Sequence, residues 1–112
     1  MAPMQEHSAE LLSRLAAWFT SECDGDWEHQ HGVTLQTCDN PGWLLKVDLV
    51  GTSLESKAFA PVSFGCDDDG FQGNNDRWLH CSVKEGKFVA AGSPTELAQI
   101  LAIFLSWAEK LS

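Results

Sequence analysis

Residues 33–50, VTLQTCDNPGWLLKVDLV, contain two runs in which apolar residues recur at every second position, separated by the turn-forming residues D-N-P-G. Such alternation is typical of β-strands with one buried face. Pro41 fixes φ and Gly42 accepts a positive φ, so the pair suits positions i+1 and i+2 of a type II turn. The stretch therefore predicts a hairpin with strands at residues 33–38 and 43–50.

The chain before this hairpin predicts a helix over residues 8–22. Ser8 can cap its start, and Glu10 suits the positive end of the helix dipole. The polar run at residues 23–26, which contains a glycine, is expected to end the helix. One apolar stripe is expected to face the core, made of Leu11, Leu12, Leu15, Trp18 and Phe19.

The chain after the hairpin predicts more strands. Residues 57–65 are expected to be extended, and Pro61 favours either an edge position or a bulge. Residues 66–76 are polar and rich in glycine, which predicts a surface loop. A second hairpin is expected from residues 78–83 and 87–91, around a turn at residues 84–86.

The last helix begins at the sequence S-P-T-E, residues 93–96, which is typical of a capping box with proline at the first helical position. In that box the Ser93 hydroxyl accepts a hydrogen bond from the N–H of Glu96, and the Glu96 side chain reaches back. From residue 97 to residue 107 the helix is apolar nearly all round. It is therefore expected to lie between the sheet and the first helix, or to offer a face to another chain.

These elements predict an α+β fold in one domain, residues 1–112. An N-terminal helix is followed by an antiparallel sheet of four to five strands, with two hairpins, and by a C-terminal helix. Both helices are expected on one face of the sheet. The expected oligomeric state is a monomer or a homodimer.

The charge of the chain is strongly negative and unevenly distributed. Sixteen acids and seven bases give a formal charge of −9, and residues 1–56 hold nine of the acids but only two of the bases. A negative surface repels phosphate backbones and anionic lipids, so nucleic acids and membranes are poor candidate partners. A protein with a basic surface is the expected partner. The alternative is that the charge only promotes solubility.

The sequence also predicts a cytoplasmic location. Residues 1–7 carry neither the basic nor the apolar region of a secretory signal, and the longest apolar run, residues 100–105, is too short to span a bilayer. No C-x-x-C pair is present, which predicts free thiols in a reducing compartment for all four cysteines, Cys23, Cys38, Cys66 and Cys81.

The densest polar run is ECDGDWEHQHG, residues 22–32. In an extended backbone Glu22, Asp24, Asp26 and Glu28 would project to one side at a period of two, with Trp27 on the other. Four crowded like charges cost stability unless a basic group offsets them. The run is therefore a candidate docking site for a basic protein.

Two chemical interpretations of this run stay open. Cys23, His29 and His31 are zinc-ligating residue types, although the spacing C-x5-H-x-H matches no standard structural zinc pattern. Asp26 or Glu28 with His29 suits general acid–base catalysis. The chain has no nucleophile elbow, no H-E-x-x-H motif and no cofactor fingerprint. Neither enzymatic activity nor a cofactor is therefore expected.

A second acidic run, DDDG at residues 67–70, lies in the predicted loop. A calcium-binding EF-hand loop needs a glutamate at its twelfth position, and the twelfth residue counted from Asp67 is Trp78. An acidic loop tip is therefore expected at Asp67, Asp68 and Asp69 rather than a calcium site.

Several sequence blocks together resemble the immunity protein 53 family of bacterial polymorphic toxin systems. These blocks are CDGDWEH (residues 23–29), GV (32–33), DNPGW (39–43) and DL (48–49), then Trp78, His80-Cys81 and a last helix with Phe104 and Trp107. The likeness covers roughly residues 12–108. It implies an intracellular antidote that is encoded beside a toxin gene and blocks that toxin. Cys38 and the Cys66–Asn75 segment, which looks like an insertion, depart from the family pattern.

The resemblance and the charge together predict an acidic face that binds the toxin by surface complementarity. The aromatic candidates act as anchors only if they are exposed. A deep pocket lined by Asp26, His29 and Trp43 would instead favour a small-ligand or metal-binding domain that uses the Asp24–His31 segment. The candidate toxin-binding residues are Asp24, Asp26, Trp27, Glu28, Trp43, Asp67, Asp68 and Asp69.

Overall fold

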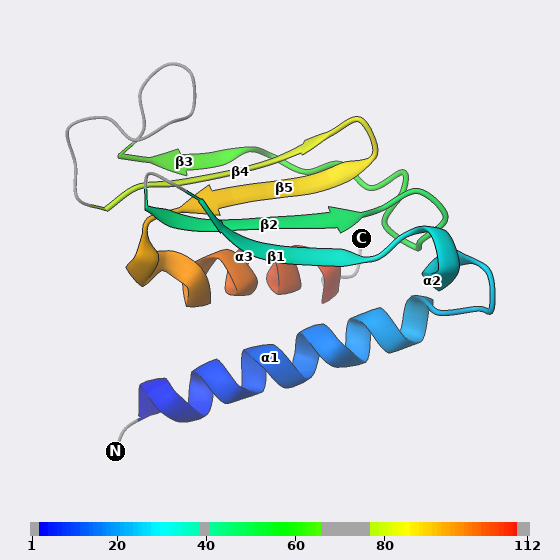
Figure 1. The fold of residues 1–112 in the computed structure, drawn as a ribbon, viewed down its shortest axis with the longest axis horizontal. Coiled ribbons are helices and arrows are strands. Elements are labelled where there is room, and N and C mark those ends of the chain that lie inside the picture. Colours follow the sequence, from blue (N-terminus) through cyan, green and yellow to red (C-terminus); the bar gives the residue numbers. More distant parts are fainter. Residues whose placement is uncertain (1–2, 39–40, 66–76, 110–112) are drawn as a thin grey trace.

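Two long helices and a five-stranded sheet form most of the molecule (Figure 1). The computed structural model describes residues 3–38, 41–65 and 77–109. The predicted loop at residues 66–76, with Cys66 and the acidic tip Asp67–Asp69, lies outside the described residues. In chain order the elements are α1 (Pro3–Glu22), α2 (Trp27–Gln30), β1 (Val33–Cys38), β2 (Gly42–Asp48), β3 (Val62–Phe64), β4 (Leu79–Lys84), β5 (Lys87–Gly92), the 3-10 turn η1 (Pro94–Glu96) and α3 (Leu97–Glu109).

The strands form one antiparallel sheet in the order β1-β2-β5-β4-β3. Both predicted hairpins are confirmed: β1 pairs with β2, with Val33 opposite Val47, and β4 pairs with β5. The β4–β5 connection places Glu85 at φ 54° and Gly86 at φ 79°. Positive φ at both central residues is the geometry of the type I′ turn, which matches the twist of a hairpin.

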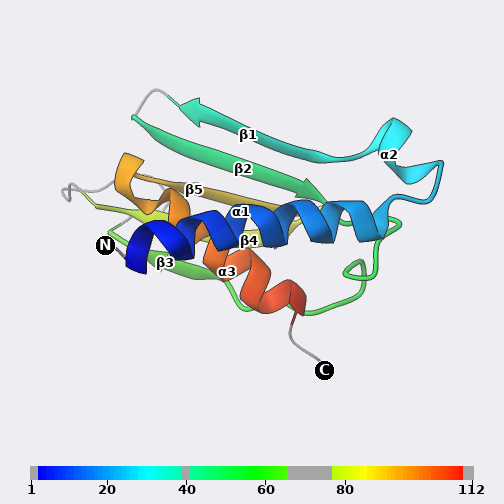
Figure 2. The same ribbon diagram turned by 90° about the horizontal axis from the view of Figure 1, so that it is seen from below.

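Both helices cover the same face of the sheet, as Figure 1 shows from the side and Figure 2 from below. This arrangement confirms the predicted α+β fold. β3 forms one edge of the sheet directly after Pro61, and β1 forms the other. The edge position predicted from the proline is therefore confirmed.

The core lies between the sheet and the two helices. Strand residues that face the helices, such as Leu45 and Phe88, are fully buried. Phe104 of α3 is also fully buried, and its ring centroid lies 5.1 Å from that of Trp18 and 5.0 Å from that of Phe88. Because α3 contacts both the sheet and α1, most of its apolar surface is covered within the chain.

The first helix differs from its prediction at two points. α1 begins at Pro3, so Ser8 lies inside the helix and the predicted serine cap is wrong. Proline suits the first helical position because its φ is already near the helical value and it has no N–H to satisfy. Leu12, assigned to the buried stripe, is 56% exposed, whereas Leu11 and Trp18 are buried. The neighbouring elements cover a narrower stripe of α1 than its sequence offers.

Gly42 has a role other than the predicted one. It lies in β2 opposite Cys38, and its φ is not positive, so the type II turn with Gly42 at i+2 is wrong. A Cβ atom at Gly42 would lie 2.3 Å from the carbonyl oxygen of Gly92 and 3.1 Å from the Trp78 ring. Glycine is therefore needed at this position because β2 and β5 approach each other closely there.

The predicted capping box at the start of the last helix is also wrong. Ser93 precedes η1 but makes no side-chain hydrogen bond to it, and its Oγ instead accepts the N–H of Trp78 at 3.2 Å. The carboxylate of Glu96, a buried residue, accepts hydrogen bonds of 2.8 and 3.3 Å from the guanidinium of Arg77. Arg77 and Trp78, which precede β4, thus bond to the two side chains that would have formed the capping box.

Among the described residues, no helix is both long enough and apolar enough to cross a membrane. Cys23 and Cys38 are free thiols, as predicted from their spacing.

Candidate functional site

The predicted acidic run folds at the end of the molecule where α1 stops and α2 leads into β1 (Figure 1). The turn after β2, residues 50–56, packs on it. Trp27 Nε1 donates a hydrogen bond to the Val50 carbonyl oxygen at 3.0 Å, and Ser53 Oγ donates to Glu22 Oε2 at 2.6 Å. We call residues 22–31 and 50–56 the acidic end. It holds five carboxylates and neither lysine nor arginine.

Two of these carboxylates organise the backbone around them. Asp24 Oδ1 accepts the N–H groups of Asp26 and Trp27, both at 2.9 Å. The Glu28 oxygens accept the N–H groups of Asp24 and Gly25, also at 2.9 Å. The segment is therefore a hydrogen-bonded turn, and the predicted extended arrangement of carboxylates at a period of two is wrong. Short acidic side chains bond to nearby N–H groups and so compete with extended structure.

These hydrogen bonds keep both carboxylates charged. Backbone hydrogen bonds from Trp27 and then Asp26 lower the pKa of Asp24 below its ordinary value. The pKa of Glu28 is lowered by its own N–H and by those of Asp24 and Gly25, against the opposing effect of desolvation. Desolvation raises the pKa of the Cys23 thiol, and the charges of Glu28 and Asp24 add to this effect. The thiolate form that a zinc ligand or a nucleophile requires is therefore disfavoured.

The two lowered pKa values predict the response of the acidic end to acid. Because each pKa is lower in the folded than in the unfolded chain, the stabilisation is complete at neutral pH and is lost as the pH falls through the folded-state value. We expect the amide resonances of Asp26 and Trp27 to shift in an NMR titration at a pH below the ordinary range of carboxyl groups.

The substitution Asp24→Asn is the control for this titration, because it keeps an acceptor oxygen and removes the titrating group. It should abolish the transition seen at Asp26 and Trp27, and leave the transition at Gly25, which reports on Glu28. A transition at or above the ordinary carboxyl range would contradict the hydrogen-bond account.

Of the two candidate aromatic anchors, Trp27 is buried and Trp43 is partly buried. Trp27 is 4% exposed, and its ring lies 6.2 Å from that of Trp18 and 5.7 Å from that of Phe19. Trp43 is partly buried against the core, and its Nε1 donates to the Pro94 carbonyl oxygen at 3.2 Å. Trp27 therefore lacks the exposure that a direct contact requires, whereas Trp43 keeps part of its surface accessible. Trp27 instead fastens the acidic end to the core.

Asp26 differs from the other carboxylates of the acidic end. Its side chain is exposed and makes no hydrogen bond or ion pair with any residue that the structure describes. The ion pairs among the described side chains join other acids, for example Glu109 with Arg14 and Asp48 with Lys87. Within the described residues, the charges of the acidic end thus have no lysine or arginine counterpart.

The zinc alternative finds no support in the geometry. Across residues 3–38, 41–65 and 77–109, no group of three or more His, Cys, Asp or Glu side chains is placed to hold a metal ion. Cys23 donates its thiol hydrogen to the Phe19 carbonyl oxygen at 3.2 Å, and His31 Nδ1 lies 3.5 Å from Asp48 Oδ2. Each of these two candidate ligands therefore has a different partner.

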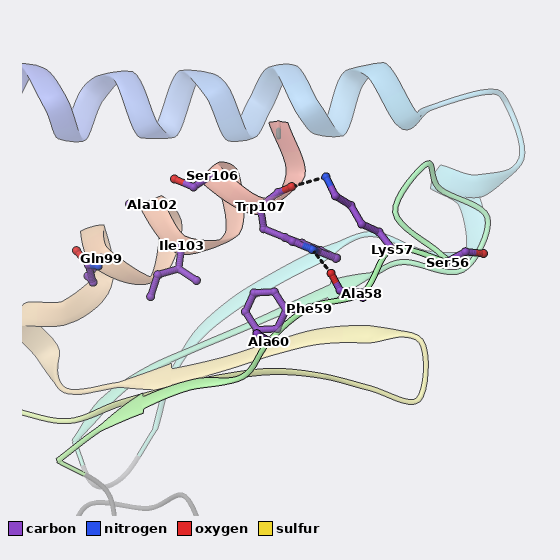
Figure 3. Close-up of a pocket in the computed structure, with 10 residues that line it drawn as sticks. All are labelled: Ser56, Lys57, Ala58, Phe59, Ala60, Gln99, Ala102, Ile103, Ser106 and Trp107. Carbon is purple, nitrogen blue, oxygen red and sulfur yellow. Dashed lines mark hydrogen bonds between the residues drawn. The ribbon is translucent and has the colours of Figure 1, made fainter. Parts of the chain in front are cut away.

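An open groove of about 850 Å³ lies between α3 and residues 56–60 (Figure 3). Lys57 Nζ donates to the Trp107 carbonyl oxygen at 2.7 Å, and Trp107 Nε1 donates to the Ala58 carbonyl oxygen at 2.7 Å. Figure 3 shows both bonds joining Trp107 of α3 to the segment at residues 57–58. They join residues 57–58 to α3, so these polar groups stabilise the fold.

Two smaller hollows border α1. None of the three hollows is lined by Asp26, His29 or Trp43, the residues that the small-ligand alternative requires. The hollow beside β1 touches the acidic end through His31 alone, so none of these three hollows gathers the groups of the acidic end that a small-ligand site would use.

No function was predicted from the sequence for the outer edge of β1. It lies beside a hollow of about 430 Å³ that α1 lines with Leu12, Leu15, Ala16 and Phe19. Charged residues and proline usually protect an edge strand from pairing with another chain. Residues 33–38 contain neither, and this was the sequence feature that could have indicated an open edge.

The fold and the acidic end define a small α+β protein with one helix-covered sheet face and with five carboxylates at one end that have no lysine or arginine partner among the described side chains. The chain belongs to the immunity protein 53 family, whose model matches residues 12–109. The resemblance noted in the sequence is thereby confirmed, and the membership implies a toxin-neutralising function. Comparisons with curated proteins and with solved structures gave no match.

Proposed function

We propose that this protein binds and neutralises one cognate toxin through complementarity between its acidic end and a basic surface of the toxin. One observation carries the proposal: five carboxylates gather at one end with no lysine or arginine counterpart among the described side chains. Backbone hydrogen bonds hold two of them, Asp24 and Glu28, in the charged form. A basic partner would supply the missing charges and speed association.

The candidate residues contribute to this surface in different ways. Asp24 and Glu28 both shape the turn and add charge, whereas Asp26 is free to contact the toxin directly. Trp27 supports the acidic end from within, whereas Trp43 lies opposite Thr37 at the other end of the β1–β2 pair and stays a predicted contact. The acidic tip Asp67, Asp68 and Asp69 stays a predicted contact.

The proposed action is occlusion of the toxin, so it requires neither catalysis by this chain nor a cofactor. We place it in the cytoplasm, because a reducing compartment suits the free thiols of Cys23 and Cys38. A typical interface of this kind buries about 800 Å² on each partner.

The substitution Asp26→Lys tests the position of the interface. We expect it to lower the association rate constant about 3- to 10-fold at low salt and to weaken the salt dependence of that rate. The dissociation rate should change less, because long-range charge acts mainly on encounter. The measurement is binding kinetics over a series of salt concentrations, with a catalytically inactive domain of the toxin encoded beside this gene.

Glu10→Lys is the matched control. It makes the same change in net charge at an exposed site twelve residues before Glu22 on α1, about 18 Å along the helix. It should leave the association rate nearly unchanged. Equal effects of the two substitutions, or no effect of Asp26→Lys, would show that the toxin binds elsewhere.

A further inference from the structure

β1 forms an unprotected edge of the sheet. It lies at the end of the strand order and, among the residues that the structure describes, pairs only with β2. Its six residues carry no charge and no proline, and four of them are exposed. The opposite edge strand, β3, has three residues and follows Pro61. Charge, proline and shortness are the usual features that keep an edge from pairing with another chain. β1 lacks all three.

The hydrogen bonds between β1 and β2 determine which backbone groups of the edge are available. The N–H of Asp48 donates to the carbonyl oxygen of Gly32 at 3.0 Å. In an antiparallel pair the hydrogen-bonded positions alternate, so the even-numbered residues of β1 bond to β2. The odd-numbered residues direct their N–H and C=O groups outward: Val33, Leu35 and Thr37.

The side chains of these odd-numbered residues lie on the helix-covered face, where α1 leaves part of the surface open. Leu35 is 41% exposed, and Leu12 of α1 is 56% exposed. The hollow of about 430 Å³ is lined by Leu12 and Ala16 of α1 and by Val33 at the start of β1, two residues before Leu35 on the same face. A strand added to β1 would place every second side chain on this face, over Leu35 and beside the hollow.

The acidic end adjoins the same hollow, because His31 and Gly32 line it and connect α2 to β1. A segment lying along β1 would therefore bring one of its ends close to the carboxylates of the acidic end. A second copy of this chain carries a net charge of −9 and has no basic segment to offer them. A basic strand complements both the charge and the edge.

We propose that an extended, basic segment of the toxin pairs with the outward edge of β1. Its backbone bonds to Val33, Leu35 and Thr37, its apolar side chains enter the hollow beside Leu12, and its lysine or arginine side chains reach the acidic end. This inference rests on the proposed function and names the element through which that function operates.

Backbone amide exchange of the unaltered chain tests the pairing without any substitution. In the free protein, the outward N–H groups of Val33, Leu35 and Thr37 should exchange fast. The N–H groups of Thr34 and Gln36, which point toward β2, should exchange slowly. Binding of the inactive toxin domain should slow the three outward amides at least about tenfold. A toxin that covered the strand without hydrogen bonds to it would leave the three outward amides exchanging faster than the inward ones.

A pair of matched substitutions gives an independent readout. Leu35→Lys places a positive charge on the proposed edge, and Val62→Lys places the same charge on the opposite edge strand, at a residue of similar exposure (37% against 41%). We expect Leu35→Lys to weaken toxin binding at least about tenfold and Val62→Lys to change it less than about twofold. Equal effects of the two would overturn the edge pairing.

The outcomes separate this inference from the proposed function. If the toxin domain binds while the three outward amides keep their free-state exchange, the edge pairing is wrong and the neutralising role stands. If the domain does not bind the unaltered chain, both are wrong. If the outward amides are already protected in the chain alone and light scattering gives twice the monomer mass, the occupant is a second copy, and the inference is overturned.

Discussion

The substitution Phe104→Ala is expected to lower the free energy of unfolding by about 3–5 kcal/mol. Phe104 is fully buried, and its ring contacts those of Trp18, Phe88 and Trp107 at centroid distances of 5.1, 5.0 and 6.2 Å. Alanine would remove all three contacts and leave a cavity between α1, α3 and the sheet. Close-packed interiors relax only partly around such a cavity.

Urea denaturation followed by far-ultraviolet circular dichroism measures this loss. Leu12→Ala is the control, because it also shortens an apolar side chain of a helix, but at a site that is 56% exposed. Its effect should stay within about 0.5 kcal/mol. A loss below about 1 kcal/mol for Phe104→Ala would show that the sheet and the helices do not share one core.

The substitution Trp27→Ala is expected to cost about 3–5 kcal/mol as well, and to loosen the acidic end. Trp27 is the side chain that joins this end to the core, through its ring contacts with Trp18 and Phe19 and its hydrogen bond to Val50. We expect the amides of residues 24–28 to exchange faster in this variant. Toxin association should also slow, because the carboxylates would no longer be held in one arrangement.

Trp27→Phe is the matched control, since it keeps most of the buried ring and removes the indole N–H that bonds to Val50. It should cost less, with about 1 kcal/mol from the lost hydrogen bond. If Trp27→Ala kept both the stability and the toxin kinetics of the unaltered chain, the acidic end would not depend on the core.

The sequence predicted the architecture well because period-two alternation and turn residues are local signals. They located β1, β2, β4 and β5 to within about two residues, and Pro61 correctly indicated an edge strand. The errors concern side chains that had a choice of partners. Ser93 and Glu96 fit a capping box by spacing, yet Trp78 and Arg77 hold them in the fold. Spacing along the chain contains no information on such distant competitors.

The candidate site shows the same difference between local signals, which the sequence contains, and partners that depend on the fold. Composition alone located the acidic end, because the carboxylates are close in sequence. It did not reveal that Asp24 and Glu28 bond to the backbone while Asp26 stays free, since this depends on the turn at Gly25. The open edge of β1 was missed because neither its position at the end of the strand order nor the gap left by α1 at Leu12 is encoded locally.

The central claim is that this chain neutralises its toxin by binding it, and an activity titration tests this claim most directly. The active domain of the toxin encoded beside this gene is mixed with increasing amounts of the chain at a concentration well above the dissociation constant. The account predicts that toxin activity falls in proportion to added chain and vanishes at one equivalent. Full toxin activity in the presence of several equivalents of folded chain would contradict it.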